Sequence, residues 1–435
     1  MRKYRFIACS SAVLAAAVFG FACARLTTPG TVAFLPIDPN PSANPEPQPS
    51  FLPPMPASGP ALCKGNFLKP DQGKAVLDFS LQHFATSQSV WQQHAAHLRA
   101  DIQRGVGLYP FPQKTPLNAQ IFNKRTYDGY TAESVTFQSI PGFYACCTLY
   151  RPLHPVREKL PAILNTHGHG NPETSGRFAE NVQHRSGTLA RMGAIALSTE
   201  MFAYGDSLQQ VPAEAHTKSD LAMPMQLWNN IRALDFLETL PDVDPTRLCI
   251  TGESGGATQT FLLTALDSRI SINVPVVMVS SYFFGGCQCE SGRPVHRDVD
   301  HFCTNAEIAS LCCPRPMLVI SDGKDWTQHV PEIEFPFLQK IYALNGVLTN
   351  VENVHLAQDA HNYGPNKRLA MYQYFARKLD LDVTATTNGK GELDESRVTV
   401  EKPDDIRIWT KDHPLPGTAL HGVDAIRAEL VSLQQ

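Results

Sequence analysis

The chain has little of what nucleic-acid-binding and integral membrane proteins need. Charged residues make up only 18% of its 435 residues, the formal net charge is −4, and basic residues never form a run of five or more. A basic surface that follows a phosphate backbone is therefore not expected. After residue 23, the sequence contains no apolar stretch long enough for a membrane span. The 43% apolar content instead predicts a globular protein with one large core and no nucleic-acid partner.

The first residues have the pattern of an export signal. Three basic residues within 1–5 precede an apolar stretch over 6–23, and the Ala-Cys-Ala triplet at 22–24 fits a small-x-small cleavage site. We therefore expect a signal peptide over 1–24 and a periplasmic or secreted protein. A lipid anchor at Cys23 is the second interpretation, although the residues before it lack the usual leucine. A membrane partner is expected only in that case.

Composition and periodicity divide the rest of the chain. Prolines crowd the region between Thr28 and Pro60, which predicts a tether without a core of its own. Helical spacing of apolar residues follows, and strand and helix patterns then alternate to about Leu381. The expected parts are a signal peptide over 1–24, a linker over 25–64, a helical extension over 65–130, a catalytic domain over 131–382 and a C-terminal tail over 383–435. Within the tail, residues 397–410 suggest one or two short strands before a final helix.

The alternation of patterns predicts the fold class. The segment "ESVTFQSIPGFYACCTLYRP" alternates with period two around the Pro141-Gly142 turn, as an antiparallel hairpin does. Strand and helix patterns then follow in turn from "PAILNTHG" to "KRLAMYQYFARKL". They predict a mostly parallel twisted sheet with helices on both faces. A hairpin that leads into such a sheet resembles the α/β-hydrolase fold.

The strongest motif is Gly252-Glu253-Ser254-Gly255-Gly256, which lies directly between an apolar strand and an apolar-periodic helix. This context is that of a nucleophile elbow, where the turn from strand to helix is so tight that glycines must flank the serine. The helix that follows points its N-terminus at the reacting centre and favours developing negative charge there. We therefore predict that Ser254 is a nucleophile; the structural alternative is an ordinary glycine-rich turn.

The base and the acid that such a serine needs follow later in the chain. The segment "NVHLAQDAHNYGPNKR" has His361 in a loop between the last strand and the last long helix, so His361 is the predicted base. The segment "PMLVISDGKDWT" offers Asp325 and Asp322 as the carboxylate that orients the histidine. Asp325 is preferred, because Asp322 at the strand end is typical of a turn former. Glu290, after an earlier strand, is the third candidate.

The oxyanion of an acyl-transfer reaction needs two backbone donors. The amide of Gly255, directly after the nucleophile, is the first of them. The glycine-rich turn "NTHGHG" supplies the second, which we predict to be the amide of His169. Together these groups predict two-step acyl transfer through an acyl-enzyme, without a cofactor.

The set "HGHG", "GESGG", "GGCQCE", "SDGKDW" and "DAHNYG" resembles the bacterial acetyl xylan esterase-like and dienelactone hydrolase-related α/β-hydrolases, over about residues 133–381. The resemblance implies an exported serine esterase that acts on acyl or methyl esters of a small molecule or polysaccharide. Dienelactone hydrolases proper use a cysteine nucleophile, so Ser254 does not imply their reaction.

Two other functions are compatible with the same motifs. A prolyl-oligopeptidase-like serine peptidase shares the elbow and the residue order, but too few residues precede the catalytic part for a propeller. A catalytically inactive carbohydrate-binding relative is the second alternative, and it would be expected to have lost one of the three triad residue types. All three types are present.

The cysteines raise the question of a metal. Cys287 and Cys289, followed by His296, His301 and Cys303, combine the thiolates and imidazoles that zinc prefers. The one-residue gap between the first two cysteines is, however, shorter than usual for zinc, and an exported protein favours oxidised sulfur. We therefore expect no metal, and instead a loop at the rim of the site that is braced by a disulfide.

Overall fold

The computed structural model of the chain describes residue 49, residues 68–297 and residues 302–435. The predicted signal peptide, almost all of the predicted linker and His301 lie outside the described residues. Among the described helices, none combines the length and the apolar character that a membrane crossing requires.

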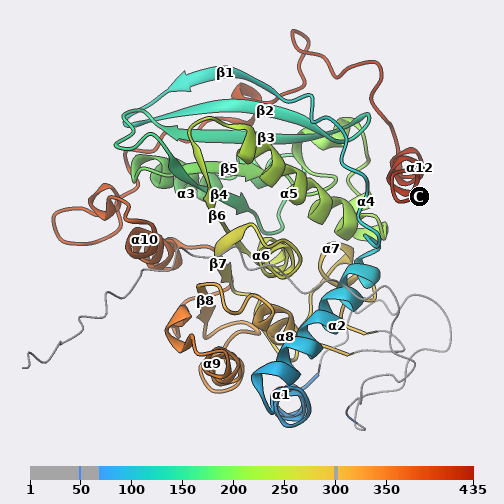
Figure 1. Cartoon of the computed structure of the whole chain (residues 1–435). Helices are drawn as coiled ribbons and strands as arrows, with labels where there is room; N and C mark the ends of the chain where they lie inside the picture. The colour runs from blue at the N-terminus through green and yellow to red at the C-terminus, as the bar shows by residue number, and fades with distance from the viewer. Residues whose placement is uncertain (1–48, 50–67, 298–301) are drawn as a thin grey trace, which may run out of the picture. The chain divides into compact units, whose positions relative to one another are not determined.

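One mixed sheet organises the described part of the chain (Figure 1). Its strands are β1 (Gln120–Thr126), β2 (Tyr130–Ile140), β3 (Phe143–Pro152), β4 (Leu160–Thr166), β5 (Ile195–Thr199), β6 (Val243–Glu253), β7 (Ile270–Val276), β8 (Met317–Asp322) and β9 (Val351–Leu356). They lie in the order β1-β2-β3-β5-β4-β6-β7-β8-β9. The first part is antiparallel, and the run from β5 to β9 in this order is parallel. The predicted α/β fold with a mostly parallel sheet is therefore confirmed.

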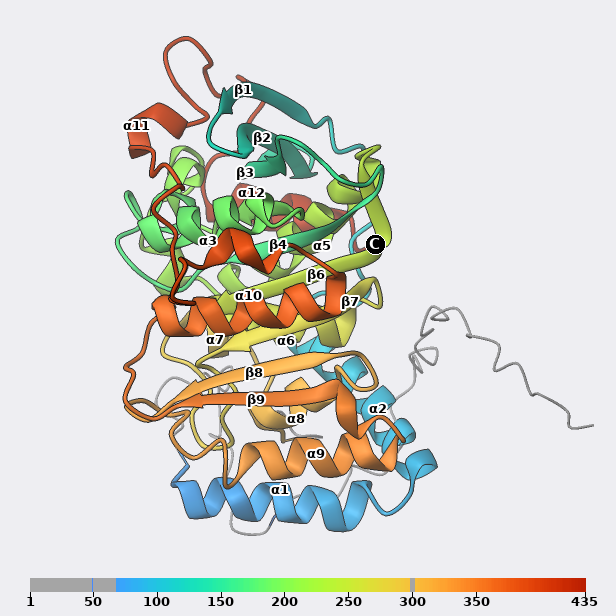
Figure 2. The same ribbon diagram turned by 90° about the vertical axis from the view of Figure 1, so that its left-hand side faces the viewer.

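Helices cover both faces of the sheet (Figures 1 and 2). The α-helices are α1 (Pro70–Phe84), α2 (Gln88–Val106), α3 (Glu180–Arg191), α4 (Ala215–Lys218), α5 (Ala222–Thr239), α6 (Gly255–Leu266), α7 (Gln288–Ser291), α8 (Asn305–Ser310), α9 (Glu334–Leu344), α10 (Pro365–Leu379), α11 (Pro403–Ile406) and α12 (Val423–Ser432). Short 3-10 turns are η1 (Gly176–Phe178), η2 (Gly205–Gln209), η3 (Leu348–Asn350) and η4 (Val383–Thr386). One face of the sheet packs against α3 and α10, and the other against α5, α6, α8 and α9.

Two apolar clusters fill the space on either side of the sheet. Ile163 on β4 belongs to the cluster that contains Leu189 of α3 and Phe375 of α10. Its neighbour Leu164 belongs to the opposite cluster, together with Phe261 of α6. Because side chains alternate along a strand, consecutive apolar residues serve opposite faces. The unbroken apolar runs that predicted these strands therefore reflect burial on both sides.

The N-terminal helices α1 and α2 extend the second of these clusters. Val76, Leu77, Trp91 and Leu98 are buried in it. Helix α1 lies beside α9 (Figure 2), and α2 contacts α6. The helical spacing in the sequence predicted this pair of helices. Their apolar faces pack against helices of the sheet, among them α9 and α6, so these two helices share the core on this face of the sheet and have no separate core.

Strand β1 was not predicted from the sequence. It pairs with β2 at the edge of the sheet, and most of its residues are exposed or half-buried. Its residues, "QIFNKRT", do not alternate between apolar and polar. When neither face of a strand packs on the core, its sequence does not need to alternate between apolar and polar residues.

The C-terminal segment over 397–410 contradicts the prediction of one or two short strands. Its backbone instead bonds to buried side chains. The amide of Gln183 donates to the carbonyl of Glu401 at 2.9 Å and accepts from its N–H at 2.8 Å. Asp206 accepts from the N–H of Ile408 at 2.9 Å. Because side chains satisfy these backbone groups, the segment needs no neighbouring strand. The expected final helix is present as α12.

Arg177 lies at the centre of this arrangement and is fully buried. Its guanidinium donates to Glu200 at 2.7 Å and to the carbonyl of Ile406 at 2.8 Å, and it forms an ion pair with Asp206. Burial raises the pKa of Glu200 to about 7 despite this cation. The guanidinium is thus the counter-charge for two buried carboxylates.

We expect Arg177→Met to lower the free energy of unfolding by about 3–5 kcal/mol, because Glu200 and Asp206 would be left buried without a cation. Chemical denaturation followed by circular dichroism measures this change. In limited proteolysis, the variant should also be cleaved within residues 397–410 after a shorter digestion time than the wild-type protein. The matched control is Arg397→Met. Arg397 lies on the same C-terminal segment, but its ion pair with Asp128 is exposed, so its loss should change the free energy of unfolding little. Equal denaturation midpoints for the Arg177 variant and the wild-type protein would contradict this role.

Candidate functional site

Ser254 lies where β6 turns directly into α6. Its backbone has φ 54° and ψ −122°, a region that residues other than glycine rarely adopt. Its N–H donates to the carbonyl of Val276 on β7 at 3.0 Å, and its carbonyl accepts from the N–H of Thr258 at 3.0 Å. Backbone bonds on both sides therefore hold this strained conformation. The geometry is that of a strand-to-helix nucleophile elbow.

Close backbone contacts explain two of the glycines around this turn. A Cβ on Gly252 would lie 2.6 Å from the carbonyl oxygen of Gly256, and a Cβ on Gly256 would lie 2.8 Å from the carbonyl oxygen of His167. Non-bonded Cβ atoms do not approach backbone atoms this closely, so glycine is required at both positions. The turn after β4 therefore packs directly on the start of α6.

His167 fixes this turn to the segment after β5. Its Nδ1–H donates to the carbonyl of Gly168 at 2.8 Å, and its Nε2 accepts from the N–H of Met201 at 3.0 Å. Burial lowers the pKa of His167 to about 3. The imidazole is thus a neutral bridge between two loops, and it adds no charge to the site.

His361 and Asp325, which are 36 residues apart in the chain, are in contact: Nδ1 of His361 lies 2.7 Å from Oδ2 of Asp325. The other oxygen of Asp325 accepts from the N–H and the hydroxyl of Thr327, each at 2.6 Å. The carboxylate side chain is only 2% exposed, whereas the imidazole is 32% exposed. A carboxylate held in this way keeps the hydrogen on Nδ1 and leaves Nε2 to accept a proton.

Asp322 is engaged with Lys367 rather than with His361. Oδ2 of Asp322 lies 2.9 Å from Nζ of Lys367, and both side chains are fully buried. Its Oδ1 accepts from the N–H of Lys324 at 3.0 Å, as a turn former does. Burial raises the pKa of Asp322. Lys367 also donates to the carbonyl of Ala360 at 2.6 Å, so this ion pair supports the loop that carries the histidine.

Glu290, the third candidate carboxylate, contacts a different histidine. Its Oε2 accepts from the N–H of Gly286 at 2.6 Å, and its Oε1 lies 3.7 Å from Nδ1 of His169. Burial raises the pKa of Glu290. Of the three carboxylates, Asp325 is therefore the one that the structure joins to His361.

The predicted triad residues follow strands that run in parallel. Ser254 follows β6, Asp325 follows β8 and His361 follows β9, and β6, β7, β8 and β9 are neighbours in this order. Since the carboxyl ends of parallel strands share one edge of a sheet, the three loops lie at the same edge. Trp326 stands beside His361, with ring centroids 4.4 Å apart, and stacks on Phe283 at 3.9 Å. An aromatic surface therefore adjoins the imidazole.

The two predicted oxyanion donors belong to segments that touch. Gly255 is the first residue of α6, so its N–H has no acceptor within the helix. A Cβ on Gly255 would lie 2.8 Å from Cε1 of His169, which means that the imidazole packs on the start of the helix. Negative charge is favoured at such a helix end.

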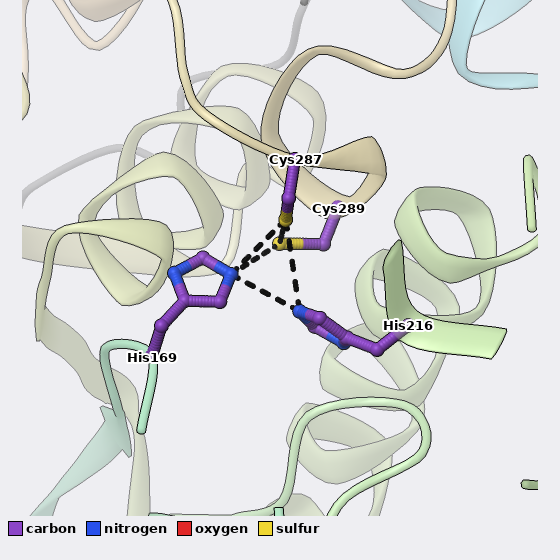
Figure 3. A group of neighbouring side chains, drawn as sticks. All are labelled: His169, His216, Cys287 and Cys289. Atoms are coloured by element: carbon purple, nitrogen blue, oxygen red, sulfur yellow. Dashed lines mark hydrogen bonds between the residues drawn. The ribbon is translucent and has the colours of Figure 1, made fainter. Parts of the chain in front are cut away.

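The side chain of His169 takes part in a cluster that the sequence analysis did not find (Figure 3). His169, His216, Cys287 and Cys289 point toward one another. Nε2 of His169 lies 3.0 Å from Nε2 of His216 and 3.1 Å from each sulfur. The sulfur of Cys287 lies 2.9 Å from that of Cys289 and 3.7 Å from Nε2 of His216. Two thiols and two imidazoles at this range form a candidate metal centre.

The cysteines of this cluster contradict the expectation of a loop braced by a disulfide. Cys287 and Cys289 are free thiols, and their sulfurs meet two imidazoles. His169 and His216 precede Cys287 by 118 and 71 residues. A search for ligands within one short segment cannot detect partners at such separations. The only signal in the sequence was the paired cysteines themselves.

The other residues that were considered as zinc ligands have different partners. Nε2 of His296 lies 2.6 Å from Oδ1 of Asn305. The thiol of Cys303 donates to the carbonyl of Val295 at 3.4 Å. His301 lies outside the described residues. The contacts of His296 and Cys303 are those of residues that hold their own loop.

Comparisons with known proteins give a consistent result. No family model matches the chain. The solved structure of methylesterase BT1017 superposes with a TM-score of 0.77 and 37% sequence identity, covering 84% of this chain and 80% of that chain. The structure of a "putative acetyl xylan esterase (BF1801)" from Bacteroides fragilis NCTC 9343 superposes with a TM-score of 0.51 and 14% identity, covering 72% of this chain and 88% of that chain, which shows a shared fold.

A curated sequence is also similar. "Putative hydrolase YtaP" of Bacillus subtilis (strain 168) is 26% identical in an alignment of 174 positions that covers 36% of this chain and 58% of that protein. This match therefore spans little more than half of the relative's length.

The resemblance predicted from the motifs is confirmed by these comparisons. The strongest support is the 37% sequence identity in an alignment that covers 80% of the methylesterase. The chain belongs to the α/β-hydrolase superfamily, within the group of esterases that includes methylesterase BT1017.

Proposed function

We propose that the protein is an exported serine esterase that hydrolyses methyl esters of uronic acid residues in a polysaccharide. The observation that carries this proposal is the contact of 2.7 Å between His361 and Asp325, at the same edge of the sheet as the strained turn at Ser254. Similarity to a methylesterase supports the methyl ester. In a carbohydrate, a methyl ester requires a carboxyl group, which uronic acids supply. The signal peptide predicted over 1–24 supports export.

In the proposed reaction, the hydroxyl of Ser254 attacks the ester carbonyl while Nε2 of His361 removes its proton. Asp325 keeps the imidazole in the required tautomer and stabilises the imidazolium that forms. His361 then protonates the methoxy oxygen as its bond to the acyl carbon breaks, so methanol leaves and an acyl-enzyme remains on Ser254. Water, activated by the same imidazole, attacks the acyl-enzyme and releases the uronate.

The N–H groups of Gly255 and His169 are the proposed donors to the tetrahedral oxyanion. Their segments are in contact, because the imidazole of His169 packs on Gly255. The N-terminus of α6 adds a favourable field for the negative charge. Preorganised donors of this kind contribute to the rate because they do not have to reorient during the reaction.

Trp326 is the residue that we propose to contact the sugar next to the scissile ester. Its ring stands beside His361 and is only partly buried. A sugar ring has apolar C–H faces that suit an aromatic surface, and ligand sites are commonly lined in this way.

We expect the mature enzyme to release methanol from a methyl-esterified polyuronate with a higher kcat/KM than it shows on acetylated xylan, a feruloyl ester or a prolyl peptide. Ser254→Ala should lower kcat on the preferred ester by about 10³-fold or more, since the nucleophile is lost. Ser432→Ala, an exposed serine on α12, is the matched control and should keep full activity. Methanol release and ester titration measure the rates.

Other outcomes of this panel would revise the proposal in defined ways. Preference for the acetyl ester would change the substrate class and keep the serine mechanism. Faster cleavage of the peptide would favour the peptidase. The proposal that Ser254 is the nucleophile of an esterase would be contradicted by either of two results. One is full turnover by Ser254→Ala, and the other is the absence of a fluorophosphonate adduct on Ser254 of the wild-type protein.

The orienting carboxylate is tested by comparing Asp325→Asn, Asp322→Asn and Glu290→Gln. We expect Asp325→Asn to lower kcat by about 10³ to 10⁴-fold, because an amide neither fixes the tautomer nor stabilises the imidazolium. The other two variants should keep kcat within about tenfold of wild type. Asp322→Asn should mainly lower the melting temperature, since Lys367 would stay buried without its counter-charge. A fully active Asp325→Asn enzyme would refute the assignment.

A further inference from the structure

We infer that His169, His216, Cys287 and Cys289 bind one zinc ion in a closed structural site that holds the oxyanion side of the active site together. The metal site itself is argued from the cluster alone. Its effect on turnover also rests on the proposed function.

The separations within the cluster suit a single ion. Zinc with Zn–S of about 2.3 Å and Zn–N of about 2.0 Å sets the ligand atoms of a tetrahedron about 3.3–3.8 Å apart. Five of the six separations run from 2.9 Å between the two sulfurs to 3.7 Å between Cys287 and His216, and all four ligand atoms lie within 4.8 Å of one another. Changes of at most about 1.3 Å in these separations would therefore give tetrahedral geometry.

The histidines are oriented as metal ligands are. Nδ1 of His216 lies 2.8 Å from the carbonyl oxygen of Phe202. A carbonyl only accepts, so Nδ1 carries the hydrogen and Nε2 directs a lone pair into the cluster. Nδ1 of His169 faces the Glu290 carboxylate at 3.7 Å, again with Nε2 toward the sulfurs. A carbonyl or carboxylate behind the ligating imidazole is typical of metal sites.

The ligand types select the metal and its role. Two thiolates and two imidazoles favour zinc, whereas magnesium and calcium prefer oxygen ligands. Four protein ligands complete the tetrahedron and leave no position for a water or a substrate, which is the arrangement of structural rather than catalytic zinc. Cys289 and His216 are buried, at 0% and 1% exposure, so solvent exchange at the ion would be restricted.

The site connects three loops at the carboxyl edge of the sheet (Figure 3). His169 comes from the turn after β4, His216 from α4 in the segment after β5, and the two cysteines from the start of α7 in the segment after β7. These loops have no strand pairing with one another in the sheet. An ion bound to all three would join them at one point, in addition to the bond that His167 makes between the first two.

The cluster also adjoins the reacting centre. A Cβ on Gly255 would lie 2.8 Å from Cε1 of His169 and 3.3 Å from Oε1 of Glu290. A metal-bound imidazole would therefore be fixed against the residue whose N–H is the first proposed oxyanion donor. The backbone of His169, the second proposed donor, would be fixed with it. His169 is thus a positioning residue through its side chain.

The experiment uses the mature protein, purified without a histidine tag. We expect about one zinc per chain by mass spectrometry of the metal content. The double variant Cys287→Ser/Cys289→Ser should fall to less than about a tenth of that content, because hard hydroxyl ligands replace both thiolates. Cys249→Ser is the matched control, a buried cysteine outside the cluster whose sulfur lies 3.6 Å from the hydroxyl of Ser271. It should keep its zinc.

Cobalt substitution gives an independent signature. The wild-type protein loaded with Co²⁺ should show the visible absorption of tetrahedral cobalt and a thiolate-to-cobalt band, and the double variant should show neither. Any one of three results would overturn the proposed site. The wild-type protein could contain no zinc, the double variant could retain zinc, or the native protein could contain a disulfide between Cys287 and Cys289.

Because the double variant is at risk of misfolding, the wild-type protein is also stripped of metal with a chelator. We expect its Tm to fall by about 5 °C or more and to recover when zinc is added. On the methyl ester, kcat should fall at least tenfold with a smaller change in KM, since the oxyanion donors are displaced. Unchanged Tm and kcat after verified removal would overturn the structural role. Metal content and cobalt absorption do not depend on the ester, so a zinc-loaded protein that hydrolyses none of the esters would refute the proposed function alone.

Discussion

At the end of β6 the backbone turns into α6 within one residue, and the close approach of main chains around this turn constrains the rest of the site. Ser254 is strained at φ 54°, and the turn after β4 lies directly on the first turn of the helix. Side chains at Gly252 or Gly256 would push the two segments apart. His169 would then move away from α6, together with one proposed oxyanion donor and the cysteine cluster.

The loops around this turn are held by polar side chains more than by strand pairing. Lys367 joins Asp322 to the carbonyl next to His361, and His167 joins the turn after β4 to the segment after β5. Both residues are buried, where such bonds are stronger than in water and where loss of one partner is costly. The positions of the proposed reacting groups therefore depend on buried residues outside the proposed triad.

The site has two sides with different kinds of support. The loops after β8 and β9 carry Asp325 and His361, whose contact is itself a charge-assisted hydrogen bond. The loops after β4, β5 and β7 carry the cluster of two histidines and two cysteines. In the proposed mechanism, the first side handles the proton and the second side handles the oxyanion. A zinc ion on the second side would add a link between these loops to the hydrogen bonds that His167 and Glu290 already make there.

Local patterns in the sequence determined the features that depend on neighbouring residues. Burial on two faces leaves unbroken apolar runs, so the parallel strands were predictable, and the elbow at Ser254 is contiguous in the chain. The order of parallel strands then made Asp325 and His361 predictable partners. Tertiary structure alone decided that Asp322 pairs with Lys367, that Gln183 and Asp206 satisfy the backbone of the C-terminal segment, and that Cys287 and Cys289 meet two distant histidines. These contacts join residues far apart in the chain, and a contact of that kind imposes no periodicity on the sequence around it.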